Sequence, residues 1–161
     1  MRYLLAILLA SVPTAHAARP FVTDDARVVD KGGCQVETFV KRQSRQDESE
    51  FWILPACNPW GAELTAGHIR IDSTPSGDTR STVLQAKMLL KPLVTNGSGF
   101  ALTLGMLAGT ANSPYVNGIG SFSSADDRVV LHANLGAIRD TVARVSRGTW
   151  GAGAEGLRIL W

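Results

Sequence analysis

Two histidines, His68 and His132, are the side chains best suited to metal binding or general-base catalysis near neutral pH. Each lies in a segment where polar and apolar residues alternate, next to polar neighbours. No nucleophile motif of the Gly-x-Ser-x-Gly type accompanies them. We therefore expect both to be surface or lumen histidines, and we expect that the protein is not an enzyme.

Other patterns that could bind a metal or a cofactor lack the neighbours that such a site needs. Residues 151–156 match Gly-x-Gly-x-x-Gly, but a dinucleotide site also needs a helix after the motif and an acidic residue about 20 positions further on. The acidic pairs Asp24-Asp25 and Asp126-Asp127 lack the ligand spacing of a calcium loop. We expect solvated turns at both pairs, and neither a metal nor a cofactor.

Two lysines, Lys87 and Lys91, lie on the same side of one expected strand. Two roles remain open for them. They could line a lumen and attract anionic solutes, or they could keep one face of a sheet in contact with water.

The N-terminus has the features of a secretory signal peptide. Arg2 is followed by the apolar stretch 4–12 and by Ala15-His16-Ala17, which has the small-x-small form of a cleavage site. We expect cleavage after residue 17, an irregular N-terminal segment over 18–33 and a β-barrel domain over 34–161. An exported chain folds in an oxidising compartment, where an even number of cysteines favours a disulfide.

The two cysteines, Cys34 and Cys57, therefore predict a structural bridge. They lie too far apart for a redox pair of the Cys-x-x-Cys type and are too few for a zinc site. Opposed residues in an antiparallel hairpin have a constant index sum, which is 91 if the cysteines face each other. The same register places Lys41 opposite Glu50 and Phe39 opposite Trp52, which are favourable cross-strand pairs.

Length and composition indicate one folded domain. The chain has 161 residues, of which 45% are hydrophobic, and a formal net charge of +2. Charges this balanced give no broad electrostatic surface for nucleic acid. After the first few positions, no run of about 18 apolar residues could form a helical membrane span.

The hydrophobic pattern beyond residue 33 has mainly the two-residue period of strands. We expect strands over 34–45, 50–57, 62–73, 79–91, 99–108 and 149–161, and a short one over 115–122. Segment 128–139 fits a strand, but Leu131, Leu135, Ile138 and Val142 also fit a helical stripe, so both remain open. The count gives an all-β fold, an antiparallel up-and-down barrel of 7–8 strands that is complete or partial.

The alternation leaves one face of each later strand without charge, while the other face is polar. Several strands have the 9–11 residues that a tilted strand needs to cross a membrane. The polar face supplies the candidates for lining a lumen: Glu63, Gln85, Lys87, His132, Asn134 and Glu155. A two-residue period does not say which face meets water, so a soluble barrel or sandwich with an apolar core remains open.

Four segments resemble a family of exported Gram-negative proteins: residues 19–26 (RPFVTDDA), 50–58 (EFWILPACN), 131–140 (LHANLGAIRD) and 149–155 (TWGAGAE). They are similar to outer-membrane β-barrel proteins grouped with the meta-pathway phenol-degradation "transporter" family. The resemblance implies a membrane barrel that takes up hydrophobic or aromatic compounds, and it favours a strand over 128–139. Members of that family usually continue for several more strands, which implies here a shortened barrel or a small closed one.

Together these observations predict an outer-membrane channel or transporter for small solutes, in contact with membrane lipid. The terminal aromatic residue, Trp161, is similar to the C-terminal signal of such barrels. The alternative is a soluble periplasmic barrel or sandwich that acts as a binding or interaction module. We expect no nucleic-acid partner under either hypothesis.

Overall fold

The computed structural model describes residues 24–43, 47–74, 77–109 and 112–156. The expected signal peptide and Trp161 lie outside these ranges. The described residues form eight strands: β1 (Cys34–Gln43), β2 (Glu48–Cys57), β3 (Ala62–Ser73), β4 (Thr79–Lys91), β5 (Ser98–Ala108), β6 (Ser113–Ser124), β7 (Val129–Asp140) and β8 (Val145–Gly156). Within these ranges, no helix has the length and apolar character needed to cross a membrane.

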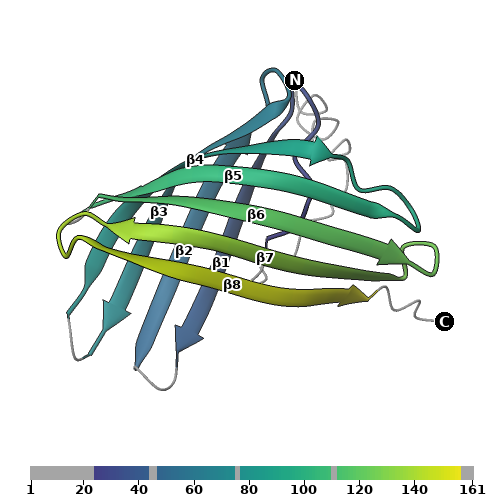
Figure 1. Cartoon of the computed structure of the whole chain (residues 1–161). Coiled ribbons are helices and arrows are strands. Elements are labelled where there is room, and N and C mark those ends of the chain that lie inside the picture. Colours follow the sequence, from purple (N-terminus) through teal and green to yellow (C-terminus); the bar gives the residue numbers. More distant parts are fainter. Residues whose placement is uncertain (1–23, 44–46, 75–76, 110–111, 157–161) are drawn as a thin grey trace, which may run out of the picture.

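The eight strands form one sheet in chain order, and every neighbouring pair is antiparallel. Figure 1 shows that the sheet curls strongly, so that β5 to β8 pass in front of β1 to β3. In the described part of the chain β1 and β8 do not pair, and the sheet is an open half-barrel. The all-β, up-and-down architecture is confirmed in its partial form, and the small closed barrel is not formed here.

The first hairpin has the register that the cysteines predict. Cys34 and Cys57 are joined by a disulfide, and the β1–β2 pairs keep the index sum of 91 from end to end. Lys41 Nζ lies 3.2 Å from Glu50 Oε1. The rings of Phe39 and Trp52 stack with their centroids 5.3 Å apart. Both cross-strand pairs are therefore formed as expected.

The segment with two open interpretations is a strand, and the helical hypothesis for it is wrong. β7 pairs with β6 on one side and with β8 on the other, so its backbone groups are bonded across the sheet. Residues 115–122 belong to the longer strand β6, and β8 begins at Val145 rather than at residue 149. A short turn makes this possible, because Asp140 Oδ1 accepts from the backbone N–H groups of Val142 and Ala143.

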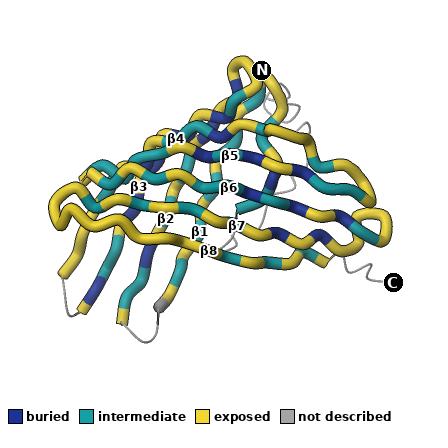
Figure 2. Tube along the Cα trace, viewed as in Figure 1, coloured by how far each residue is buried: buried dark blue, intermediate teal, exposed yellow. Residues whose placement is uncertain are grey.

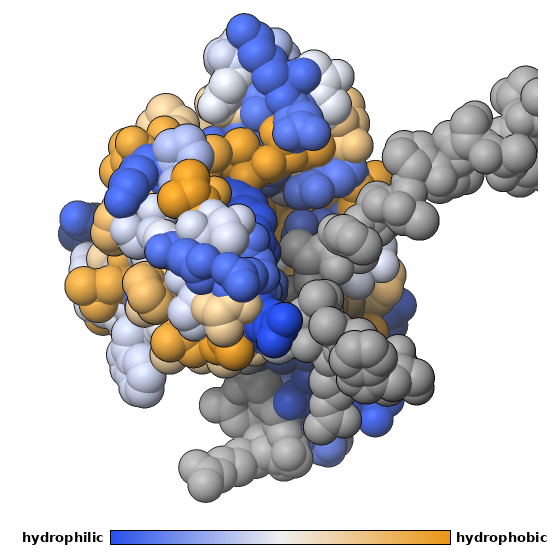
Figure 3. Space-filling view, turned by 90° about the vertical axis from the view of Figure 1, so that its right-hand side faces the viewer, coloured by the Kyte–Doolittle hydropathy of each residue, from blue (hydrophilic) through white to orange (hydrophobic). Residues whose placement is uncertain are grey.

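Residues alternate along the strands between buried or half-buried positions on the concave face and exposed positions on the convex face (Figure 2). Most of the exposed large apolar side chains lie on the convex face. The exposed large side chains of this face come from every strand: Val36, Val40, Phe51, Ile53, Leu64, Leu84, Met88, Leu90, Phe100, Leu104, Val116, Phe122, Val129, Leu131, Leu135 and Trp150. The space-filling view shows orange patches interspersed with blue ones on the face that it displays (Figure 3). We call these side chains the outer apolar band.

Apart from Lys91, the charged strand residues of the convex face lie at one end of the described strands. They are Arg42, Arg70, Asp72, Arg80 and Arg139, all near the turns that join β1 to β2, β3 to β4 and β7 to β8. The expectation that Lys91 lies on the same side of the strand as Lys87 is wrong. A bulge between Leu89 and Lys91 shifts the register of β4, so Lys91 is exposed and lies 6.0 Å from the ring centre of Phe100 on the convex face.

At the opposite end, the β4–β5 and β6–β7 turns are hydrogen-bonded to each other. Thr95 Oγ1 donates to Asp127 Oδ2 (2.6 Å), and Asn96 Nδ2 donates to Asp126 Oδ1 (2.8 Å). Asp126 N donates back to Asn96 Oδ1, and Ser123 Oγ donates to Asp127 Oδ1. We call this group the turn clasp. The acidic pair 126–127 therefore has defined partners, although both residues are exposed.

The turn clasp gives a pH-dependent prediction. The hydroxyls of Ser123 and Thr95 bond the Asp127 carboxylate and hold its pKa below the ordinary value. A carboxylate with a lowered folded-state pKa contributes stability that is complete above its unfolded pKa, near 3.8, and is lost as the pH falls through the folded value. We expect urea unfolding midpoints of the wild type and Asp127→Asn to differ at pH 6, and the difference to shrink as the pH falls below 3.8 through the folded-state pKa of Asp127. A difference that stays constant with pH would contradict this role.

Candidate functional site

Polar and charged side chains gather on the concave face of the sheet. All six side chains that we expected to line a lumen lie on this face: Glu63, Gln85, Lys87, His132, Asn134 and Glu155. Glu63, Lys87 and His132 are at most 5% exposed. Burial of such groups is costly unless they find hydrogen-bonding or charged partners. Many of these partners come from the N-terminal segment, residues 24–33.

The N-terminal segment is anchored where it enters β1. Gly32 has a φ of 83°, a left-handed conformation that favours glycine, and its N–H donates to Asn58 O. Asn58 donates its backbone N–H to Gly33 O and its side-chain Nδ2 to Val29 O (2.7 Å). Further along, Val29 N donates to Glu63 Oε2 on β3 (2.8 Å). Sequence-remote turns and strands therefore fix this segment.

Lys87 on β4 is the buried cation of the concave face. Its Nζ lies 2.8 Å from Asp24 Oδ1 and 3.4 Å from Asp25 Oδ1. The side chain of Lys87 is 5% exposed and that of Asp25 is 13% exposed. The expectation that the acidic pair 24–25 forms a solvated turn is therefore wrong, because these carboxylates neutralise a buried ammonium group.

A chain of polar contacts runs from the N-terminal segment to β8. Ala26, fully buried, donates its N–H to Ser121 Oγ (2.9 Å), which lies 2.8 Å from His132 Nδ1. His132 Nε2 lies 3.4 Å from Glu155 Oε1, and Arg27 bonds the other oxygen of Glu155 at 3.2 Å. Ser121 is 3% exposed and already accepts a backbone N–H. The Ser–His–Glu contacts therefore hold the N-terminal segment on the concave face of the sheet, which we call the wall.

A third group of polar residues lies between β3 and β6. Tyr115 donates its hydroxyl to Gln85 Oε1 (2.6 Å), and Gln85 Nε2 donates to Thr65 Oγ1 (3.3 Å). Two further side chains have buried polar atoms without a hydrogen-bond partner among the described residues, Thr103 Oγ1 and both amide atoms of Asn134. These three atoms are therefore free to form a hydrogen bond with a group from outside the described residues.

The two histidines do not meet. His132 is buried on the concave face, whereas His68 is exposed on the convex face of β3. A metal or general-base pair made from both is therefore excluded. Within the described ranges, no group of three or more His, Cys, Asp or Glu side chains is placed to hold a metal ion.

Sequence reasoning missed the partners that the N-terminal segment and β6 supply. Asp24, Asp25 and Arg27 lie in a stretch without periodicity, so nothing in the sequence indicated that it folds back onto the sheet. Ser121 and Tyr115 are different, because they occupy every second position of β6 together with Asn117 and Ile119, and these positions share the concave face. Treating 115–122 firmly as a strand would have identified both.

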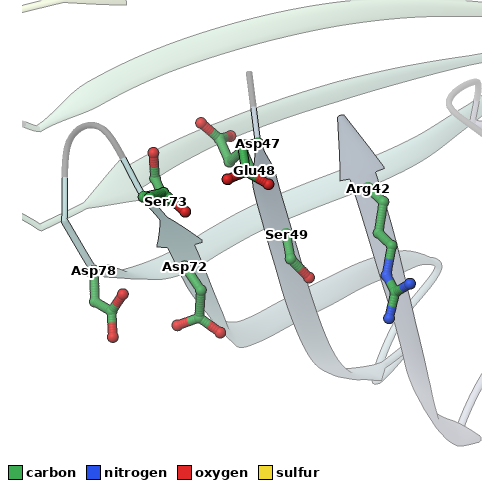
Figure 4. Close-up of a pocket in the computed structure, with 8 residues that line it drawn as sticks. Arg42, Asp47, Glu48, Ser49, Asp72, Ser73 and Asp78 are labelled. Atoms are coloured by element: carbon green, nitrogen blue, oxygen red, sulfur yellow. The ribbon is translucent and has the colours of Figure 1, made fainter. Parts of the chain in front are cut away.

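A separate open hollow of about 620 Å³ lies at the charged end of the strands, between the turns of the first and second hairpins (Figure 4). It is lined by Arg42, Asp47, Glu48, Ser49, Asp72, Ser73, Thr74 and Asp78. Its acidic side chains are spread along the rim rather than converging on one point, and Arg70 pairs with both Asp72 (2.7 Å) and Asp78 (3.5 Å). We do not assign a ligand to this hollow.

Comparison with known proteins places the chain in one family. A family model described as "uncharacterised conserved protein UCP029691" matches residues 4–156. The chain belongs to this family. The match covers all eight strands and the N-terminal segment, so both are parts of the family's common region. No curated protein and no solved structure matches the chain.

Proposed function

We propose that the chain is an exported β-barrel protein of the outer membrane that binds or passes small solutes on the concave side of its sheet. The outer apolar band carries this proposal. Monomeric soluble proteins rarely expose apolar patches beyond a few hundred Å², whereas here every strand presents large apolar side chains outward. The polar concave face would then be the lumen, as in membrane barrels.

The position of the charges supports the same orientation. The convex arginines concentrate near the turns at one end, and the strands between the turns are 10–13 residues long. Strands of about 9–11 residues are sufficient to cross the hydrocarbon layer when they are tilted. A sheet in lipid cannot keep unpaired edges, so the proposal also requires partners for β1 and β8 in the membrane-bound form.

Labelling from within the bilayer tests the orientation. We expect Leu84→Cys, Leu102→Cys and Leu131→Cys, each made singly, to react with a lipid-soluble maleimide in membranes, because these side chains belong to the convex face. Matched controls are the adjacent positions on the concave face, Val83→Cys, Thr103→Cys and Val130→Cys, which should stay unlabelled. Equal labelling of both sets, or no labelling of the first, would overturn the proposed orientation.

Fractionation separates the proposal from its alternative. An outer-membrane barrel requires detergent for extraction, and we expect the full chain in the membrane fraction after a high-salt wash. Recovery entirely in the soluble periplasm without detergent would contradict the proposal and support a soluble binding or interaction module.

A further inference from the structure

The partners of Lys87 come from the N-terminal segment and not from the wall that carries it. Among the described residues, Asp24 and Asp25 supply the carboxylates within 4.0 Å of Lys87 Nζ. Glu63 lies directly opposite Lys87 in the β3–β4 register. However, Glu63 Oε2 accepts from Val29 N and from Gln35 Nε2 instead. The wall therefore presents an ammonium group that has no close ion pair within the sheet.

On its other side, Lys87 has an unsatisfied hydroxyl as its neighbour. Thr103 on β5 lies directly opposite Lys87 in the β4–β5 register. It is 2% exposed, and its Oγ1 has no hydrogen-bond partner among the described residues. Opposed side chains in such a pair have Cβ atoms about 5 Å apart. The wall thus combines a buried cation with a free buried hydroxyl, and both groups can donate to an anionic oxygen.

We propose that Lys87 and Thr103 form a binding site for the carboxylate group of a solute, and that Asp24 and Asp25 occupy this site as a built-in competitor. The inference names a solute class for the proposed lumen and so rests on the proposed function. Asp24 and Asp25 belong to a segment that is tethered to the sheet at β1. A tethered competitor acts at a high effective concentration. The site therefore binds an external carboxylate only when Asp24 and Asp25 move away from Lys87.

The contacts of the segment allow local displacement. Its end near β1 is held by Asn58 and Glu63, while residues 24–27 contact the side chains of Lys87, Ser121 and Glu155. Ala26 also packs against Ala101 and Ile119, so its burial must be given up when the segment moves. Asp24 and Arg27 are partly exposed, 39% and 45% at their side chains. Residues 24–27 can therefore leave the wall without breaking any strand pairing.

Titration with succinate tests the site on the full chain in detergent. We expect Asp24→Asn/Asp25→Asn to bind succinate at least about tenfold more tightly than the wild type, because the internal competitor is removed. Adding Lys87→Met should abolish this binding, and adding Thr103→Val should weaken it about fivefold, the value of one hydrogen bond. Asp30→Asn, an exposed acid of the same segment, is the matched control and should bind as the wild type does. Succinamide, which has no carboxylate, should not bind to any variant.

A second measurement needs no change at the site itself. Ala26 is fully buried against the wall, so a thiol introduced by Ala26→Cys should react slowly with a water-soluble maleimide. We expect succinate, but not succinamide, to accelerate this labelling several-fold as the segment is displaced. The proposal is wrong if the double variant binds succinate no better than the wild type. It is also wrong if the double variant that carries Lys87→Met in addition binds succinate as tightly as the double variant itself.

These results are independent of the membrane orientation. If fractionation shows a soluble protein, the same titrations without detergent still measure the site, and only the proposed function fails. If the chain inserts as proposed but the double variant gains no affinity for succinate, only the carboxylate site fails.

Discussion

Leu104→Arg should largely abolish membrane insertion. Leu104 lies near the middle of β5 in the outer apolar band and is 47% exposed. An arginine on the lipid face of a barrel costs about 2–4 kcal/mol at the bilayer midplane and about 0–1 kcal/mol near the interfaces. The midplane cost lowers the equilibrium constant for insertion by a factor of about 30 to 1,000. Insertion into vesicles, measured as protection of the sheet from protease, provides the readout.

Ala108→Arg is the matched control for this change. Ala108 ends β5 on the same convex face, close to the level of the turns, so the same charge should have little effect there. The soluble alternative predicts a gain from Leu104→Arg and not a loss. There, Leu104→Arg would break up an exposed apolar surface and increase the yield of soluble protein. Unchanged insertion of Leu104→Arg would show that this face does not meet lipid.

Removing the disulfide should produce the second large effect. Cys34 and Cys57 are separated by 23 residues, and a loop of this size loses about 3 kcal/mol of unfolded-state entropy when it is closed. β1 depends on this bond because it has β2 as its single neighbour in the described sheet. We expect Cys34→Ser/Cys57→Ser to lower the free energy of unfolding in urea by about 2–5 kcal/mol.

The matched condition for the disulfide is the wild type with a reducing agent. It should reproduce the loss seen in the double variant, while the reducing agent should leave the double variant itself unchanged. A loss confined to the variant would point to the serine hydroxyls rather than to the missing bond.

The part of the fold that sequence could predict is the part governed by alternation. Two cysteines were enough to set the register of β1 and β2, because each further pair then follows by counting. The same counting placed residues such as Glu63 and Lys87 on one face. The face of Lys91 was predicted wrongly because a bulge shifts the alternation by one residue, and a bulge depends on the partner strand rather than on the local sequence.

The rest depended on contacts between distant segments. Leu131 and Leu135 satisfy both the helical and the strand period, and only the neighbours of β7, namely β6 and β8, decide between them. The N-terminal segment has no period at all, and its place on the wall is set by ion pairs with residues about 60 and 130 positions away. Such pairing cannot be read from the composition of residues 24–33 alone.

The even number of strands in the described sheet has a geometric consequence for growth of that sheet. Because all neighbours are antiparallel, β8 runs opposite to β1. A copy of the unit laid alongside the first would thus bring its leading edge against the trailing edge of the other with the correct polarity. The unit is modular in this sense: its circumference can be extended in steps of eight, and no strand has to be reversed.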